Sequence, residues 1–432
     1  MTSFRSATPL HQLDAWQAAI LLARRELRAV DLVRACLDRM AEREPQLHAF
    51  VQLGADAALA TARELDAGPV RGLLHGLPFG VKDLFDTFDL PTAYGSPIYA
   101  NQQPLADAAA VALCREAGAV LLGKTVTTEL ANMFPGATRN PHHPAHTPGG
   151  SSSGSAAAVA DAMLPLALGT QTAGSLIRPA AFCGVVGYKP SHNRVPRAGV
   201  KSLSETLDTV GGFARSVRDV ALLGAVLTGD ARLADPAAFA QGAAPRIGFC
   251  RTPEWALADE DTQQAWARAE AALAGHGVHT ALPPGLSGLV AVQKEVQAFE
   301  TARSLSHERL RHRDQLSAPL QALIATGLAI AGETHVHNLR VTAQARGQVQ
   351  ALFESHDVLL APSSIGEAPA GLDGTGDPLF CRTWTLLGLP CVHLPFARGR
   401  HGLPVGLQLV GAHGDDHRLL AAAHWVHARL ST

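Results

Sequence analysis

The chain has 432 residues, of which 47% are hydrophobic and 17% charged, and its 36 basic and 38 acidic side chains leave a formal net charge of −2. This balance excludes the strongly basic surface that binds nucleic acid. The most apolar stretch, Ala156 to Leu168, is short and is interrupted by Asp161, so no membrane span is expected.

The N-terminus has no basic segment followed by an apolar run, so the sequence predicts no signal peptide. The cysteines are scattered and form no C-x-x-C pair; they are Cys36, Cys114, Cys183, Cys250, Cys381 and Cys391. This spacing favours reduced thiols over a disulfide framework or a zinc site. We therefore expect a cytoplasmic protein.

Short apolar runs alternate with helix-like segments, which is typical of an α/β fold with helices on both faces of a sheet. An apolar helical face that includes Leu32, Val33 and Met40 is expected to end near Pro45. The predicted strands are Pro78 to Lys82, Ala119 to Gly123, Val185 to Lys189, Ile247 to Cys250, Val358 to Ala361 and Val405 to Val410.

Residues 228–245 have little periodicity and are interpreted as a connector between the two halves of the chain. The motifs lie in a core of about residues 60–230, and residues 246–432 are expected to complete the sheet and the substrate cleft. We interpret residues 1–432 as one domain.

Two serine- and glycine-rich segments and one lysine carry most of the functional information. The segments are Gly149 to Ser155 and Thr170 to Ser175, and Lys82 ends the upstream run Gly76-Leu77-Pro78-Phe79-Gly80-Val81-Lys82. Together they supply two hydroxyls, one amine and several small residues. These groups suit nucleophilic serine chemistry without histidine.

The serine cluster admits three different interpretations. Gly150 to Gly154 matches G-x-S-x-G, which would make Ser152 a nucleophile, but a loop precedes it where a nucleophile elbow requires a strand. A phosphate-binding loop would require a lysine after its last glycine. A plain flexible loop fits this segment alone. However, Thr172, Ala173 and Gly174 are small enough for their N–H groups to converge on an oxyanion beside Ser175.

Taken together, these motifs resemble the amidase signature family, which cleaves amides with a Ser-cisSer-Lys triad. The similarity also includes Gly118 to Thr125, Gly169 to Pro190 and Gly402 to Gly411. The resemblance implies a large mixed sheet covered by helices, with Lys82 as base, Ser151 behind a cis peptide from Gly150, and Ser175 as nucleophile. The two serines are 24 residues apart, as in the family.

In this chemistry, neutral Lys82 accepts a proton from Ser151 while Ser151 accepts one from Ser175. The lysinium then returns the proton to the departing amine. Burial disfavours a charged lysine, so we expect a dry environment without nearby carboxylates. The oxyanion hole is assigned to the backbone N–H groups of Thr172, Ala173, Gly174 and Ser175.

The chain departs from the common family pattern beside the nucleophile. Gln171 replaces an acid, Ala173 replaces a glycine, and Arg178 stands one position later than the usual arginine. We hypothesise that Gln171 and Arg178 replace the usual contacts as a pair. Ser152 is expected to bond to the local backbone.

Other polar residues receive weaker assignments. Tyr94, Asn132, Met133 and Phe134 lie in segments that border the substrate cleft in relatives, so substrate contact and ordinary packing both remain open. The histidines at 142, 143, 146, 335 and 337 lack a matching acid or cysteine pattern, so no metal site is expected. Asp83 points to the face opposite Lys82 in a strand and is assigned a structural role.

The sequence therefore predicts an amidohydrolase that needs no cofactor and acts on a small amide and water, with a homodimer left open. One alternative is the glutaminase subunit of a tRNA-dependent amidotransferase. The short stretch between Glu129 and Asn140, and Thr127-Thr128 in place of a methionine-aspartate pair, speak against it. A hydrolase of carbamate or urea-like substrates and a non-catalytic binding protein on the same scaffold also remain open.

Overall fold

The computed structural model describes residues 8–240 and 244–431. Within them, one mixed sheet contains eleven strands. The strands are β1 (Phe50–Leu53), β2 (Pro78–Lys82), β3 (Val120–Thr125), β4 (Leu166–Gln171), β5 (Val186–Lys189), β6 (Thr209–Ala214), β7 (Ile247–Phe249), β8 (Gly277–His279), β9 (Val358–Pro362), β10 (Cys391–Arg398) and β11 (Pro404–Val410).

The strand order is β1-β3-β2-β4-β6-β5-β10-β11-β9-β7-β8. β2 pairs in parallel with β3 and β4, and β7 pairs in parallel with β8 and β9. The strands in between pair antiparallel, including β5 with β10, where the two halves of the chain meet. The predicted α/β fold with a large mixed sheet is confirmed. The single domain stays a prediction, which this shared sheet supports.

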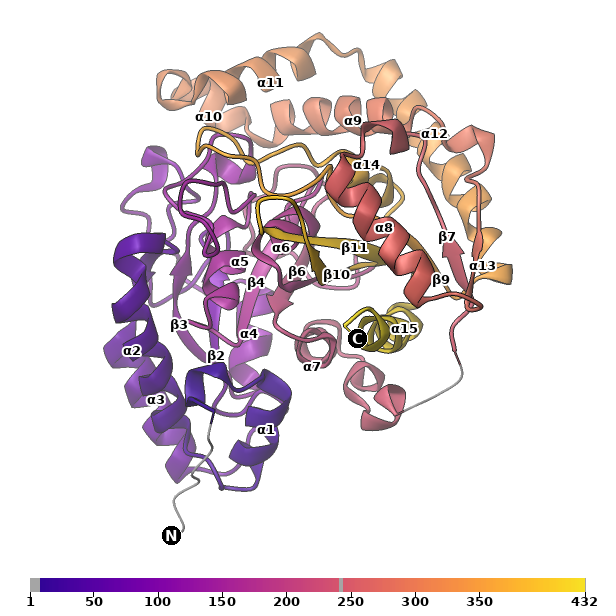
Figure 1. Ribbon diagram of the computed structural model, residues 1–432. Helices are drawn as coiled ribbons and strands as arrows, with labels where there is room; N and C mark the ends of the chain where they lie inside the picture. Colours follow the sequence, from indigo (N-terminus) through magenta and orange to yellow (C-terminus); the bar gives the residue numbers. More distant parts are fainter. Residues whose placement is uncertain (1–7, 241–243, 432) are drawn as a thin grey trace.

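Helices surround the sheet, and the segments from α9 to α11 form a layer at one end (Figure 1). The helices are α1 (Ala15–Ala23), α2 (Ala29–Leu47), α3 (Ala55–Ala67), α4 (Ala109–Glu116), α5 (Ser153–Ala160), α6 (Ile177–Cys183), α7 (Val217–Thr228), α8 (Glu260–Ala272), α9 (Leu289–Ser304), α10 (Ser306–Arg311), α11 (Ala318–Ala329), α12 (Gly332–Gln350), α13 (Leu352–Ser355), α14 (Leu379–Leu386) and α15 (Asp416–Leu430).

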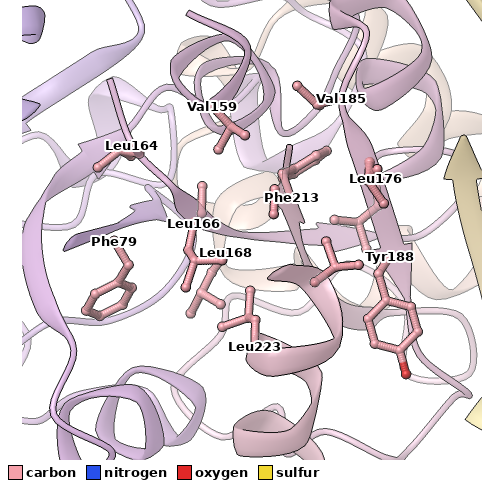
Figure 2. Close-up of a cluster of buried hydrophobic side chains, with 14 of the residues drawn as sticks. Phe79, Val159, Leu164, Leu166, Leu168, Leu176, Val185, Tyr188, Phe213 and Leu223 are labelled. Atoms are coloured by element: carbon pink, nitrogen blue, oxygen red, sulfur yellow. The ribbon is translucent and has the colours of Figure 1, made fainter. Parts of the chain in front are cut away.

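The centre of the sheet packs between α5 and α7, which both contact β4 and β6. Figure 2 shows Val159 of α5 above Leu166 and Leu168 of β4, and Leu223 of α7 below them. All of these side chains are buried, as is Phe213 of β6. Burial on both faces fixes β2 and β4, the strands that carry the candidate site, in a dry core.

All six predicted strands are present, with ends that differ by at most a few residues. The sequence patterns did not predict β1, β4, β6, β8 and β10. β6 contains two adjacent glycines, and β4 continues an apolar run. Neither strand therefore shows the alternation of apolar and polar residues by which a half-buried strand is recognised. α2 also continues past Pro45 to Leu47, because a proline in the last turn removes only one helical hydrogen bond.

The proposed connector consists of two short 3-10 turns, Ala231–Ala234 and Pro236–Phe239, after α7. Residues 241–243 of this segment lie outside the described residues. No helix among the residues placed by the structure is long and apolar enough to cross a membrane.

The close approach of α11 to α9 yields a stability prediction. A Cβ on Gly327 of α11 would collide with the carbonyl oxygen of Ala298 in α9. We expect Gly327→Ala to lower the free energy of unfolding by about 1–3 kcal/mol, because backbone must move to relieve the collision. The matched control is Gly347→Ala in α12, because Gly347 is exposed and a Cβ there would have nothing within 4 Å. It should raise stability by about 0.5–1 kcal/mol. Urea denaturation measures both, and equal effects would contradict the packing argument.

Candidate active site

Lys82 is the last residue of β2, and its side chain is fully buried. Its Nζ donates hydrogen bonds to Ser151 Oγ and to Thr170 Oγ1, each at 2.7 Å. Thr170 lies on the neighbouring strand β4, so the sheet itself positions one of the two acceptors. The sequence motifs did not single out Thr170.

Burial lowers the pKa of Lys82 to about 7, against a smaller opposing effect of the Asp208 charge. The adjacent carboxylate does not reach this amine, because Asp83 faces Lys124, whose Nζ lies 3.2 Å from Asp83 Oδ1. Asp208 accepts hydrogen bonds from the Leu203 and Ser204 backbone N–H groups. Lys82 therefore has the environment that favours a neutral amine.

Ser151 is buried and follows a cis peptide bond from Gly150. The expected position of the cis bond is thus the observed one. Next to it, Ser152 Oγ accepts from the Thr170 N–H at 3.3 Å and donates to the Thr170 carbonyl at 3.2 Å. Ser152 therefore ties the serine segment to β4.

Ser175 lies in the turn between β4 and α6 and is 7% exposed. Within the described chain its Oγ has no hydrogen-bond partner, and the N–H groups of Ala173, Gly174 and Ser175 donate to no acceptor. A Cβ at Gly174 would come within 2.6 Å of Pro378, whereas Ala173 sits at a cavity. The fold thus accepts alanine at 173 but requires glycine at 174.

The side chain of Gln171 hydrogen-bonds to the turn that carries Ser175. Its Oε1 accepts from the N–H groups of Leu176 and Ile177 at 2.9 and 3.0 Å. Its Nε2 donates to Thr385 Oγ1 at 2.8 Å, and Thr385 in turn donates to the Ala173 carbonyl. Because an amide both accepts and donates, Gln171 links the turn to α14, which an aspartate could not do in the same way.

Arg178 binds a different set of groups. Its guanidinium donates to the Gly150 carbonyl at 2.6 Å, to the Gly376 carbonyl at 2.6 Å and to Thr375 Oγ1 at 3.1 Å. It therefore holds the oxygen of the cis peptide beside Ser151. Gln171 and Arg178 share no partner in the described chain, so their action as a pair stays a hypothesis.

A cavity of about 740 Å³ opens beside Ser175. Asn132, Met133 and Phe134 line it, and their contact with substrate stays a prediction. Tyr94 is not among its lining residues, because its hydroxyl is turned to Asp86 Oδ1, at 2.6 Å. The remaining wall comes from α6, α9, α11, α14 and the 373–378 loop.

A smaller cavity of about 280 Å³ is lined by Thr170, Asp208 and Lys201, and Thr172 lines both cavities. Thr172 Oγ1 donates to Asp208 Oδ1 at 2.5 Å. Thr172 thus belongs to the walls of both cavities, and its hydroxyl is held by Asp208.

Of the residues that the structure describes, no group of three or more His, Cys, Asp or Glu side chains is arranged to hold a metal ion. Two of the clustered histidines instead bond to the backbone. His142 Nε2 lies 2.9 Å from the Cys183 carbonyl, and His146 Nδ1 lies 2.7 Å from the Ala368 carbonyl. Both rings are thus held by backbone carbonyls of distant segments.

Comparisons with known proteins agree with this site. A family model described as Amidase matches residues 31–420. The chain is 36% identical to a glutamyl-tRNA(Gln) amidotransferase subunit of Roseiflexus castenholzii, covering 96% of this chain and 95% of that protein. That alignment spans 467 positions, more than this chain's 432 residues, so the relative carries segments absent here.

Two solved structures are similar over nearly their whole length. The native peptide amidase from Stenotrophomonas maltophilia is 28% identical with a TM-score of 0.83, covering 98% of this chain and 97% of that one. A structure from work on the origins of an s-triazine catabolic enzyme is 27% identical with a TM-score of 0.89, covering 96% and 98%. Fold and relatives define a hydrolase that acts on carbon–nitrogen bonds. The chain belongs to the amidase family.

The contacts of Gln171 predict a loss of function without unfolding. Gln171→Met keeps the size of the side chain but leaves the Leu176 and Ile177 N–H groups without an acceptor. We expect the free energy of unfolding to fall by about 1–3 kcal/mol and kcat/KM to fall by at least about tenfold, because the turn that carries Ser175 loses its support. Thermal denaturation and amide-hydrolysis assays measure the two effects. An unchanged kcat/KM would contradict the positioning role.

Proposed function

We propose that this protein hydrolyses a carboxylic amide to an acid and ammonia or an amine through a seryl acyl-enzyme. Ser175 is the nucleophile, Ser151 the proton relay and Lys82 the base. The observation that carries the proposal is the fully buried Lys82 Nζ, 2.7 Å from Ser151 Oγ, with Ser175 at the adjoining cavity.

In the acylation step, Ser175 Oγ forms a bond to the amide carbon while its proton passes to Ser151 and that of Ser151 to Lys82. The unbonded N–H groups of the turn, at Ala173, Gly174 and Ser175, are placed to stabilise the negative carbonyl oxygen. Collapse breaks the C–N bond, and the Lys82 proton returns through Ser151 to the departing nitrogen. A water molecule then attacks the ester by the same proton route and frees Ser175.

A second candidate is the glutaminase subunit of a tRNA-dependent amidotransferase, favoured by the 36% identity to the Roseiflexus protein. The segments that this relative has and this chain lacks favour the free-standing amidase. A carbamate or urea-like substrate is a third candidate.

The compartment, the kind of substrate and the oligomeric state are also proposals. All six cysteines are free and buried, which supports a reducing, cytoplasmic compartment. The net charge of −2 supports a small-molecule substrate rather than a nucleic acid. A homodimer stays a prediction.

The proposed activity is tested by ammonia release from glutamine, malonamide, propionamide, benzamide and a long-chain amide. We expect turnover of at least one amide, reduced at least about 10³-fold in Ser175→Ala because the nucleophile is lost. Turnover of glutamine alone would favour the amidotransferase function. Activity that persists in a folded Ser175→Ala variant would overturn the assignment of the nucleophile.

The pKa of Lys82 predicts the pH dependence. Below about pH 7 the amine is protonated and cannot accept a proton, so kcat/KM should rise about tenfold per pH unit and level off above pH 7. Stopped assays from about pH 5.5 to 9 measure this. Lys82→Arg should be inactive throughout, because arginine stays protonated. A rate that falls as pH rises through this range would contradict a neutral lysine base.

A further inference from the structure

The turn that carries Ser175 is bonded from outside by two side chains of the second half of the chain. The Thr172 carbonyl accepts a hydrogen bond from Gln293 Nε2 of α9 at 3.1 Å. The next carbonyl, that of Ala173, accepts from Thr385 Oγ1 of α14 at 2.8 Å. Gln293 and Thr385 are both buried, and α9 packs against α14 (Figure 1). The backbone of the turn is therefore bonded to two of the helices that form the wall of the large cavity.

Each of these hydrogen bonds fixes the direction of a neighbouring N–H group. The Thr172 carbonyl and the Ala173 N–H belong to one peptide unit, and in a planar trans unit the two groups point to opposite sides. This unit is trans, because the one cis bond of the described chain joins Gly150 to Ser151. The Ala173 N–H therefore lies on the side opposite Gln293.

The N–H groups directed in this way belong to the proposed oxyanion hole. By the same geometry, the Gly174 N–H lies on the side opposite Thr385. This N–H and that of Ala173 donate to no acceptor in the described chain, so both remain available to an oxyanion formed at Ser175. A change in the direction of either peptide unit would turn a donor away from that oxygen.

The amide of Gln293 is itself held in one orientation. Its Oε1 accepts from Arg382 Nη1 at 2.5 Å, which leaves Nε2 as the group that faces the Thr172 carbonyl. Nε2 also donates to Gln297 Oε1 at 3.1 Å. An amide whose oxygen accepts and whose two N–H groups both donate cannot be reversed without losing these bonds. The neighbours of Gln293 therefore specify which end of the amide meets the turn.

Gln293 does not reach the substrate side of the wall. Its neighbours on α9, Lys294, Glu295 and Gln297, line the large cavity, whereas Gln293 is fully buried and is not among the lining residues. A group in this place does not touch a molecule bound in the cavity. Its contact with the Thr172 carbonyl is the route by which it acts on the reacting centre.

We propose that Gln293 is a positioning residue for the oxyanion hole, which holds the Thr172 carbonyl and so keeps the Ala173 N–H directed at the oxygen of the reacting amide. This inference rests on the proposed amidase function and adds a residue from the second half of the chain to it. Without the Nε2 donor, the peptide unit between Thr172 and Ala173 is free to rotate. Its N–H then loses the preorganised direction on which oxyanion stabilisation depends.

The first test is Gln293→Met in the full chain, assayed with the best-hydrolysed amide of the ammonia-release panel. Methionine keeps the length of the side chain but cannot donate to the Thr172 carbonyl. We expect kcat to fall about 10–100-fold while KM stays within about threefold, because the oxyanion contact strengthens only in the transition state. The pH midpoint near 7 should not move, since Lys82 keeps both of its hydroxyl acceptors. A raised KM with unchanged kcat would assign Gln293 to the shape of the cavity and overturn the proposal.

Gln293→Glu separates the two ends of the amide and keeps the test decisive if Gln293→Met does not fold. A glutamate still accepts from Arg382 but has no N–H for the Thr172 carbonyl. We expect kcat to fall by about tenfold or more, and a wild-type kcat would overturn the proposal. Gln344→Glu makes the same change at an exposed position of α12 and is the matched control, which should leave kcat unchanged.

Crystal structures of the two Gln293 variants test the geometry without any substrate. We expect the peptide unit between Thr172 and Ala173 to be rotated or to occupy more than one orientation. A unit that keeps its wild-type direction in both variants would overturn the positioning role, whatever their activity. A rotated unit in a protein whose wild-type form hydrolyses no amide would contradict the amidase function alone.

Discussion

The burial of one amine sets the conditions for the rest of the site. Lys82 ends β2, a strand covered on both faces and paired on both edges, so its Nζ meets only the hydroxyls of Ser151 and Thr170. The adjacent acid is directed to Lys124 on the other face of the strand. Lys82 has a pKa of about 7 because burial disfavours its charged form, and the charge of Asp208 offsets this effect only in part.

At the positions beside the nucleophile that depart from the family pattern, Gln171 and Arg178 both make hydrogen bonds within the described chain. Gln171 gives the turn the acceptor it needs and adds a donor to Thr385. Arg178, moved by one helical position, reaches the Gly150 carbonyl and the 375–376 loop. A shift of one residue rotates a side chain by about 100° around a helix, so the same residue type acts on different neighbours.

The apolar patterns predicted six strands, and the family resemblance implied the large mixed sheet and the position of the cis bond. Asn132, Met133 and Phe134 line the large cavity, and their contact with substrate stays a prediction. The motifs did not reveal Thr170, Thr385 or Arg382, because each acts through a contact between segments far apart in the chain. Tyr94 does not line the cavity, because its hydroxyl bonds to Asp86 and Gln102, each eight residues away in the chain. These contacts are local, but the sequence does not show which way the loop directs the ring. The type of a residue predicts which chemistry its side chain can perform. The direction of that side chain depends on its contacts in the folded chain.

The lysine, the two serines and the turn all come from β2 to α6, in the first half of the chain. Much of the cavity wall comes from α9, α11, α14 and the 373–378 loop, in the second half. The reactive groups thus come from the first half alone, whereas both halves, which meet across one sheet, shape the cavity. Substitutions in the second half can change which molecules enter while the proton route stays intact, so this scaffold can diverge in substrate range without losing its chemistry.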